Sequence, residues 1–344
     1  MDNVTHAALG LAIAEAGFRG SLGTAGLALA LVASELPDID IFLGIGDPWA
    51  MITTHRGITH SVLLVPVVAA ALAGIWSWFS SAGSFRMFFL LAGACLLAHI
   101  GLDVLTTYGT RILEPLSSRR FGLGWVAVID PVVTGVLLAG AIAAWWLRNQ
   151  NPAAGPRFAQ AALLVVAGYF LLGAWMHQRA MRVVHRQTAQ LGAPVAADAT
   201  PQLGTIFLWR LLYRGPDTFW VARYNSLTNE LQGAQAIPAS LDPQLQPLLA
   251  TPRVQVFCHF AGQLTRPHVD PTDPNALIVE DMRFSYPTNA PIGLWALRIE
   301  FVRNGQDDPQ ARGVQFLQRQ LRPGRAGPVA ERVSPVPAGQ QSRR

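Results

Sequence analysis

Residues 87–102 read MFFLLAGACLLAHIGL, and Asp103 follows directly. The stretch is apolar except for His99, and its length approaches the roughly 20 apolar residues with which a helix crosses a bilayer. It therefore predicts a membrane-spanning helix with a histidine near its end. His99 and Asp103 are four residues apart, so on a helix they lie on one face, one turn from each other. That spacing suits two metal ligands supplied by a single element.

The composition agrees with a membrane protein. Hydrophobic residues make up 51% of the 344 residues and charged residues only 14%, whereas soluble proteins carry roughly 25% charged residues. These values exclude a disordered chain and argue against an ordinary soluble enzyme. The net charge is +5, but the cations are dispersed, so we expect no specific nucleic-acid partner. Cys95 and Cys258 lie too far apart in the sequence to form a Cys-x-x-Cys metal motif.

Five further apolar stretches accompany the first. They are residues 62–79, 158–176, 132–147, 21–36 and 4–18. The last carries His6 near one end and Glu15 near the other, and a half-buried helix is the alternative there. We therefore expect residues 1–190 to form an α-helical bundle with about four to six membrane helices, placing the chain in the inner (plasma) membrane as a multi-pass protein.

The composition changes after about residue 190. Residues 192–201 are rich in Ala and Pro and predict a linker, and strand-like runs then alternate with turn signals. These runs are residues 205–213, 218–224, 253–260, 276–284 and 294–303. We expect a small, mostly-β domain over residues 200–320, with one antiparallel sheet as the simplest form. Its expected core aromatics are Phe207, Trp209, Phe219, Trp220 and Trp295. Residues 322–344 are rich in Pro, Gly, Arg and Gln, and we expect them to be disordered.

Arginine-rich segments predict the orientation. Arg179, Arg182 and Arg186 follow an apolar stretch, and the positive-inside rule places them in the cytoplasm. The start of the chain lacks the basic region of a secretory signal. Counting the stretches back from residue 176 places the turns at residues 37–61 and 106–125 on the same side. We therefore expect the polar turns and the C-terminal domain to be cytoplasmic.

Two short motifs add ligand-type side chains at this membrane face. In residues 35–40, ELPDID, the proline ends the preceding helix, so Asp38 and Asp40 lie in a turn. In residues 55–61, HRGITHS, two imidazoles and a guanidinium occur within six residues. Polar groups inside a membrane domain are costly and indicate function by default.

Histidine and carboxylate ligands together suit zinc, and also manganese or iron. We therefore expect a site for one or two divalent ions. The predicted ligands are His6, Asp38, Asp40, His55, His60, His99 and Asp103. Glu35 and Asp130 are expected to support these ligands without touching the metal. Taken singly, His6 also fits a helix-start residue, Glu35 an interfacial acid and Arg56 a cation that sets topology.

In these motifs the sequence resembles the YdjM-type inner-membrane proteins, a family described as metal-dependent hydrolases. The resemblance covers about residues 1–180. It rests on Thr5-His6, Leu36-Pro-Asp-Ile-Asp40, His55-Arg-Gly-Ile-Thr-His60-Ser61, His99-Ile-Gly-Leu-Asp103 and Asp130-Pro131. That family is distantly similar to zinc-dependent phospholipases C and single-strand-specific zinc nucleases, helical enzymes that hydrolyse phosphodiesters. The resemblance thus implies a membrane-embedded hydrolase of phosphate esters.

The expected activity is hydrolysis of a phosphate ester by metal-activated water. Arg56 and Asp40 are the catalytic candidates, with Arg56 stabilising phosphate charge and Asp103 bridging the ions. A site at the membrane face favours an amphiphilic or phosphorylated substrate, such as a phospholipid or a lipid-linked phosphate in the bilayer. The alternatives are a non-catalytic metal-binding membrane protein and an adaptor that acts through its cytoplasmic β domain.

Overall fold

The computed structural model describes residues 1–148, 150–151, 153–285, 290–302, 309–318 and 332–334. The chain divides into two compact units. The first, here called the helical unit, comprises residues 1–45, 54–177 and 201–207. The second, here called the β unit, comprises residues 46–53, 178–200 and the chain from residue 208 onward.

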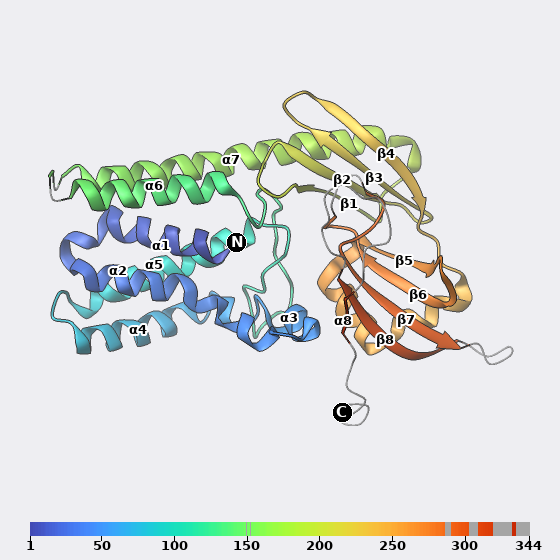
Figure 1. Ribbon diagram of the computed structural model, residues 1–344, viewed down its shortest axis with the longest axis horizontal. Helices are drawn as coiled ribbons and strands as arrows, with labels where there is room; N and C mark the ends of the chain where they lie inside the picture. The colour runs from blue at the N-terminus through green and yellow to red at the C-terminus, as the bar shows by residue number, and fades with distance from the viewer. Residues whose placement is uncertain (149, 152, 286–289, 303–308, 319–331, 335–344) are drawn as a thin grey trace. The chain divides into compact units, whose positions relative to one another are not determined.

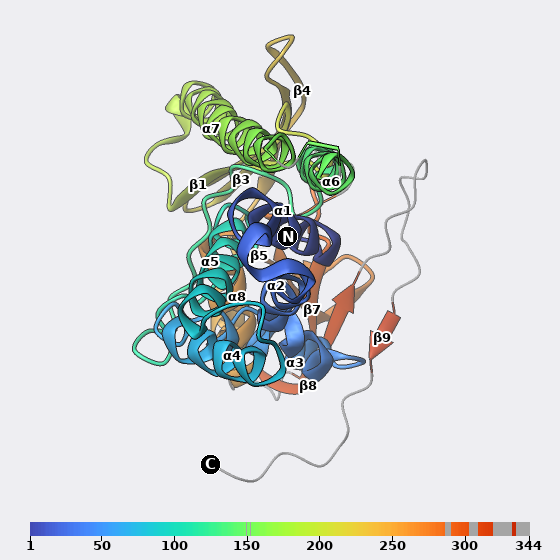
Figure 2. The same cartoon turned by 90° about the vertical axis from the view of Figure 1, so that its left-hand side faces the viewer.

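Seven α-helices and two 3-10 helices occur in the described chain up to residue 187 (Figure 1). They are α1 (Asn3–Gly17), α2 (Arg19–Glu35), η1 (Leu36–Gly44), α3 (Pro48–Thr54), η2 (Ile58–His60), α4 (Val65–Phe79), α5 (Phe85–Val104), α6 (Pro131–Leu147) and α7 (Gly155–Gln187). Each of the six apolar stretches identified in the sequence forms a helix. Figure 2 shows the helices of the helical unit nearly end-on.

Polar side chains define where several of these helices begin. Asp2 caps α1 by accepting the backbone N–H of Thr5, and Ser84 caps α5. Asp130 caps α6 and is followed by a proline at the first helical position. Inside α2, Gly23 has a φ of 56° and breaks the helix, a conformation that glycine adopts at little cost.

Two helices can each cross a bilayer by length and hydropathy, α5 and α7. The helices over residues 48–60 and 65–79 are bent by 73° and would form a third, broken span if counted as one. Helix α6 is apolar but shorter, with 17 residues. The described residues therefore provide two or three candidate spans, and the expected four to six membrane helices stay a prediction.

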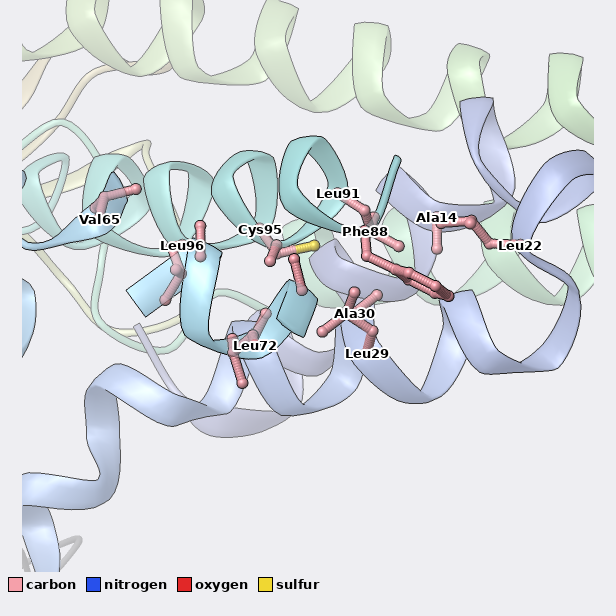
Figure 3. Packing of buried hydrophobic residues seen from close by; sticks show 14 of the residues in the cluster. Ala14, Leu22, Leu29, Ala30, Val65, Leu72, Phe88, Leu91, Cys95 and Leu96 are labelled. Atoms are coloured by element: carbon pink, nitrogen blue, oxygen red, sulfur yellow. The ribbon is translucent and has the colours of Figure 1, made fainter. Parts of the chain in front are cut away.

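The core of the helical unit lies between α2, α4 and α5 (Figure 3). Leu22 and Leu29 of α2 pack with Phe88 and Leu91 of α5, and all four side chains are fully buried. Cys95 lies in the same cluster, which agrees with a packing role. This core fixes the position of α5, whose C-terminal end carries His99 and Asp103.

The β unit holds two antiparallel sheets, where the sequence suggested one. Their strand orders are β1-β2-β3-β4 and β5-β6-β7-β8-β9. The strands are β1 (Ala196–Pro201), β2 (Leu208–Arg214), β3 (Thr218–Asn225), β4 (Glu230–Pro238), β5 (Thr265–Asp270), β6 (Asp273–Asp281), β7 (Trp295–Val302), β8 (Gln310–Gln318) and β9 (Arg332–Ser334). The unit also contains helix α8 (Pro252–Ala261) and the 3-10 helices η3 (Ala189–Leu191), η4 (Pro243–Ala250) and η5 (Gly262–Leu264), together with most of α3 and the C-terminal end of α7.

Three sequence expectations need correction here. Residues 253–260 form α8 and not a strand, because Val254, Phe257 and Phe260 recur at helical spacing and are the side chains that become buried. The predicted linker at residues 192–201 ends in β1. The predicted disordered tail lies outside the described residues, except that β9 within it pairs with β8.

The expected aromatic core of the β unit is only partly confirmed. Trp209 and Phe219 are fully buried and Trp220 nearly so. Trp295 is half-buried, and Phe207 belongs to the helical unit.

Candidate metal centre

Four ligand-type side chains from three separate elements converge in the helical unit. Asp38 comes from η1, His60 from η2, and His99 and Asp103 from α5. Their exposed fractions are 5%, 0%, 0% and 0%. Such a group could hold a metal ion, and we call it the four-residue cluster.

The spacing of the ligand atoms fits a metal ion. Nε2 of His60 lies 3.3 Å from Oδ1 of Asp38, 3.2 Å from Oδ2 of Asp103 and 3.1 Å from Nε2 of His99. Nε2 of His99 lies 3.6 Å and 3.7 Å from the same two carboxylate oxygens. Ligands bound at 2.0–2.2 Å around a tetrahedral zinc are separated by about 3.3–3.6 Å. The cluster therefore has the dimensions of a four-coordinate site.

Unpaired oxygens support the same assignment. Among the described residues, Oδ1 of Asp38 and Oδ2 of Asp103 are buried and form no hydrogen bond. Their nearest ligand-type neighbour is Nε2 of His60, at 3.3 Å and 3.2 Å, which is shared between them. A buried carboxylate oxygen without a hydrogen bond is costly, and a divalent cation between the two would compensate for that cost. The residues present thus fit a divalent metal ion.

The histidines are oriented as metal ligands usually are. Nδ1 of His99 lies 2.7 Å from the carbonyl oxygen of Ser34, which can only accept a hydrogen bond, so Nδ1 carries the proton. In the neutral imidazole the lone pair of His99 is then on Nε2, which faces the cluster. Nδ1 of His60 lies 3.0 Å from Oγ1 of Thr59 and 3.5 Å from Oδ2 of Asp40. In metal sites, the ring nitrogen of a histidine that does not bind the metal typically donates a hydrogen bond to an oxygen of this kind.

Asp40 receives several donors behind the cluster. Its oxygens lie 2.7 Å from Nδ1 of His55, 2.6 Å from Oγ1 of Thr59 and 3.1 Å from the backbone nitrogen of Arg56. Three donors thus converge on this carboxylate, and Nδ1 of His60 lies 3.5 Å from it. Asp40 is therefore placed to position both histidines.

His55 belongs to a second group with ligand-type atoms. Asp38, Asp40 and His55 each offer one such atom, and these atoms lie within 4.8 Å of one another. The side chain of His55 is 12% exposed, so it lies nearer the surface than the four-residue cluster. Asp38 belongs to both groups, whereas the sequence had suggested Asp103 as the carboxylate shared by two ions.

Arg56 lies beside the four-residue cluster and is 2% exposed. Its guanidinium donates to Oδ1 of Asp103 at 2.8 Å and to Oγ1 of Thr106 at 2.9 Å, and it lies 4.8 Å above the ring of Tyr108. Its Nε is buried without a hydrogen-bond partner among the described residues. Asp103 thus directs one oxygen toward the cluster and the other toward a cation.

His6 contacts the cluster from α1. Its ring stacks on that of His99, with centroids 3.7 Å apart and an interplanar angle of 20°. Nε2 of His6 lies 3.3 Å from Oδ1 of Asp103, the oxygen that also contacts the amino nitrogen of Met1. His6 therefore touches the oxygen of Asp103 that is paired with Arg56 and is not part of the four-residue cluster.

Glu35 and Asp130 have other partners. Glu35 ends α2 and accepts a hydrogen bond from Asn3 at 3.0 Å. Asp130 is buried, caps α6 through Val132 and accepts the hydroxyl of Tyr169 at 2.9 Å. These hydrogen bonds of Asp130 therefore stabilise the start of α6 and its contact with α7, and they do not orient a ligand histidine.

Several residues of the site were not identified from the sequence. Thr59 lies inside the HRGITHS motif, where its position next to His60 could have indicated a role. Thr106 and Tyr108 follow Asp103 closely in the chain. Ser34 acts through its backbone carbonyl, for which the sequence carries no signal.

Comparison with known proteins identifies the family of the chain. The family model described as YdjM inner membrane protein matches residues 1–180, which include every residue of the cluster. The uncharacterized protein YfhP of Bacillus subtilis (strain 168) is 26% identical over 230 residues, covering 65% of this chain and 68% of YfhP. The inner membrane protein YbcI of Escherichia coli (strain K12) is 33% identical over 132 residues, covering 36% of this chain and 73% of YbcI. No solved structure matches the chain significantly. Because the family model covers more than half of its residues, the chain belongs to the YdjM inner membrane protein family.

Proposed function

We propose that this chain is a metal-dependent hydrolase of the inner membrane that cleaves a phosphate ester. The observation that carries the proposal is the convergence of two imidazole nitrogens and two unpaired carboxylate oxygens in the four-residue cluster. Two histidines and two aspartates suit zinc, and also manganese or iron. Such an ion, when bound, lowers the pKa of water to about 7 and polarises a phosphoryl oxygen.

The residues around the cluster supply the remaining functions. Arg56 would bind an oxygen of the ester, because its guanidinium is fixed by Asp103 and Thr106 while its Nε–H is unpaired. A guanidinium fork matches two phosphate oxygens. Asp40 keeps the imidazoles of His55 and His60 in place. The catalytic candidates from the sequence thus have different roles, with Arg56 contacting substrate and Asp40 acting through its neighbours.

The membrane location supports an amphiphilic substrate, such as a phospholipid or a lipid-linked phosphate, whose ester reaches the site from the bilayer. The arginines that follow the apolar part of α7 favour a cytoplasmic position for the site and for the β unit. A second ion, held by the group of Asp38, Asp40 and His55, belongs to the same proposal.

A non-catalytic metal site is the second candidate, and one observation favours it. The four-residue cluster can fill all four positions of a tetrahedral zinc, and each of its residues is at most 5% exposed. Structural zinc sites are closed in this way, whereas catalytic sites keep a position open. A structural ion would hold η1, η2 and α5 together.

Cobalt substitution separates the two candidates. The chain, purified in detergent, would be loaded with Co²⁺ and its visible spectrum recorded with and without inorganic phosphate. Hydrolysis of bis(p-nitrophenyl) phosphate and of phosphatidic acid in phosphatidylcholine vesicles would be measured in parallel. A hydrolase is expected to show a phosphate-dependent spectrum and turnover. A four-coordinate spectrum unchanged by phosphate, together with no turnover, would support the structural ion.

Turnover retained by a chain ending at residue 207 would argue against an adaptor that acts through the β unit.

A further inference from the structure

The segment that carries two of the predicted ligands has two faces of opposite character. In η1 and its C-cap, Asp38 and Asp40 are turned inward and are 5% and 2% exposed. The other face carries large apolar side chains that are exposed. They are Ile39 (54%), Phe42 (73%), Leu43 (68%) and Ile45 (70%).

Other elements of the helical unit also carry exposed apolar side chains. Leu31 and Val32, in the last turns of α2 just before η1, are 37% and 41% exposed. Ile58 in η2, which packs against η1, is 46% exposed. On α4, the exposed fractions reach 87% at Trp78. Exposed apolar side chains thus occur on η1 and on the elements α2 and η2 that contact it, as on a protein surface that faces lipid.

The chemistry of the face fits acyl chains better than a protein partner. Protein interfaces have a polar rim and roughly one hydrogen bond per 100–200 Å². Residues 36–45 contain only two charged side chains, and both are buried. The backbone of η1 is a 3-10 helix, which satisfies most of its own hydrogen bonds, as a segment in contact with hydrocarbon requires.

We propose that the outer face of η1, formed by Ile39, Phe42, Leu43 and Ile45, inserts among the lipid acyl chains of the bilayer. The metal-binding segment is then anchored in lipid on one side and bound to the cluster on the other. This inference goes beyond the proposed function, because it holds whether the metal is catalytic or structural.

Fluorescence quenching of a single label tests the proposal. In a Cys258→Ser background, where Cys95 stays buried, the variants Phe42→Cys and Leu43→Cys would each be labelled with a nitrobenzoxadiazole dye. The protein would be reconstituted in vesicles of phosphatidylcholine and phosphatidylglycerol. Leu164→Cys, 73% exposed on the candidate span α7, is the lipid reference, and Leu227→Cys, 67% exposed between β3 and β4, is the water reference.

The proposal predicts that the labels at positions 42 and 43 behave like the label at position 164. Lipids carrying a nitroxide on the acyl chain should quench them at least twofold more than the label at position 227, and iodide in the water should quench them weakly. Strong iodide quenching would place η1 in water and overturn the proposal. Protection from both quenchers would show that protein covers the face, which would also overturn it. If one variant fails to fold, the other reports on the same face.

Discussion

The ring nitrogen Nδ1 of His99 lies 2.7 Å from the carbonyl oxygen of Ser34. This contact joins the end of α2 to α5 and fixes the proton of His99 on Nδ1. Nε2 of His99 faces His60 and the two carboxylate oxygens, and in the neutral imidazole it is the nitrogen that can bind a metal. The packing of α2 against α5 is thus directly linked to the chemistry of the cluster.

Asp40 should affect metal binding without being a ligand of the four-residue cluster. Asp40→Asn removes the negative charge that positions His60 and His55, so metal affinity is expected to fall about 10- to 100-fold. Competition with a chromophoric chelator measures the affinity. Asp130→Asn is the matched control, because Asp130 is also buried in the helical unit but bonds Val132 and Tyr169. Equal losses in the two variants would contradict this role.

Arg56 should affect turnover while leaving metal binding intact. Arg56→Lys keeps a cation beside Asp103 but loses the guanidinium fork, so hydrolysis is expected to fall about 10²- to 10³-fold, as when one oxyanion donor is removed. Metal content and turnover would be measured on the same preparation. Arg119→Lys, at an exposed arginine that stacks on Phe121, should leave both unchanged. Loss of the metal in Arg56→Lys would instead give Arg56 a structural role.

Long apolar runs are strong signals, and each of the six predicted in the sequence forms a helix. Of the seven ligands predicted from the sequence, Asp38, His60, His99 and Asp103 lie together in the four-residue cluster. The sequence could not distinguish the roles of Asp38 and Asp40, since the turn geometry of η1 decides which carboxylate faces the cluster. The carbonyl of Ser34 has no side-chain signature. Residues 253–260 were assigned to the wrong secondary structure because short apolar runs fit both periods.

Close packing between α1 and α2 should matter for the site. A Cβ added at Gly10 would clash with the side chain of Ser34 and the carbonyl of Ala30. Gly10→Ala is therefore expected to destabilise the helical unit by about 1–3 kcal/mol through overpacking and to weaken metal binding through Ser34. Thermal unfolding in detergent measures the first effect.

Gly20→Ala is the control for this prediction. No atom lies within 4 Å of a Cβ added at Gly20 in α2, so this variant is expected to be neutral or more stable by up to about 1 kcal/mol. If Gly10→Ala were as stable as Gly20→Ala, α1 and α2 would have moved apart without loss of stability, and the prediction of overpacking would be wrong.

The metal content of the purified protein tests the central claim most directly. Elemental analysis of the detergent-purified chain would be compared with that of a His60→Gln/His99→Gln variant, which spares the ion pair between Asp103 and Arg56. The four-residue cluster predicts at least one divalent ion per chain in the unmodified protein and its loss in the variant. An unmodified protein that holds no metal and takes up none when zinc or manganese is added would contradict the metal centre and the hydrolase proposed from it.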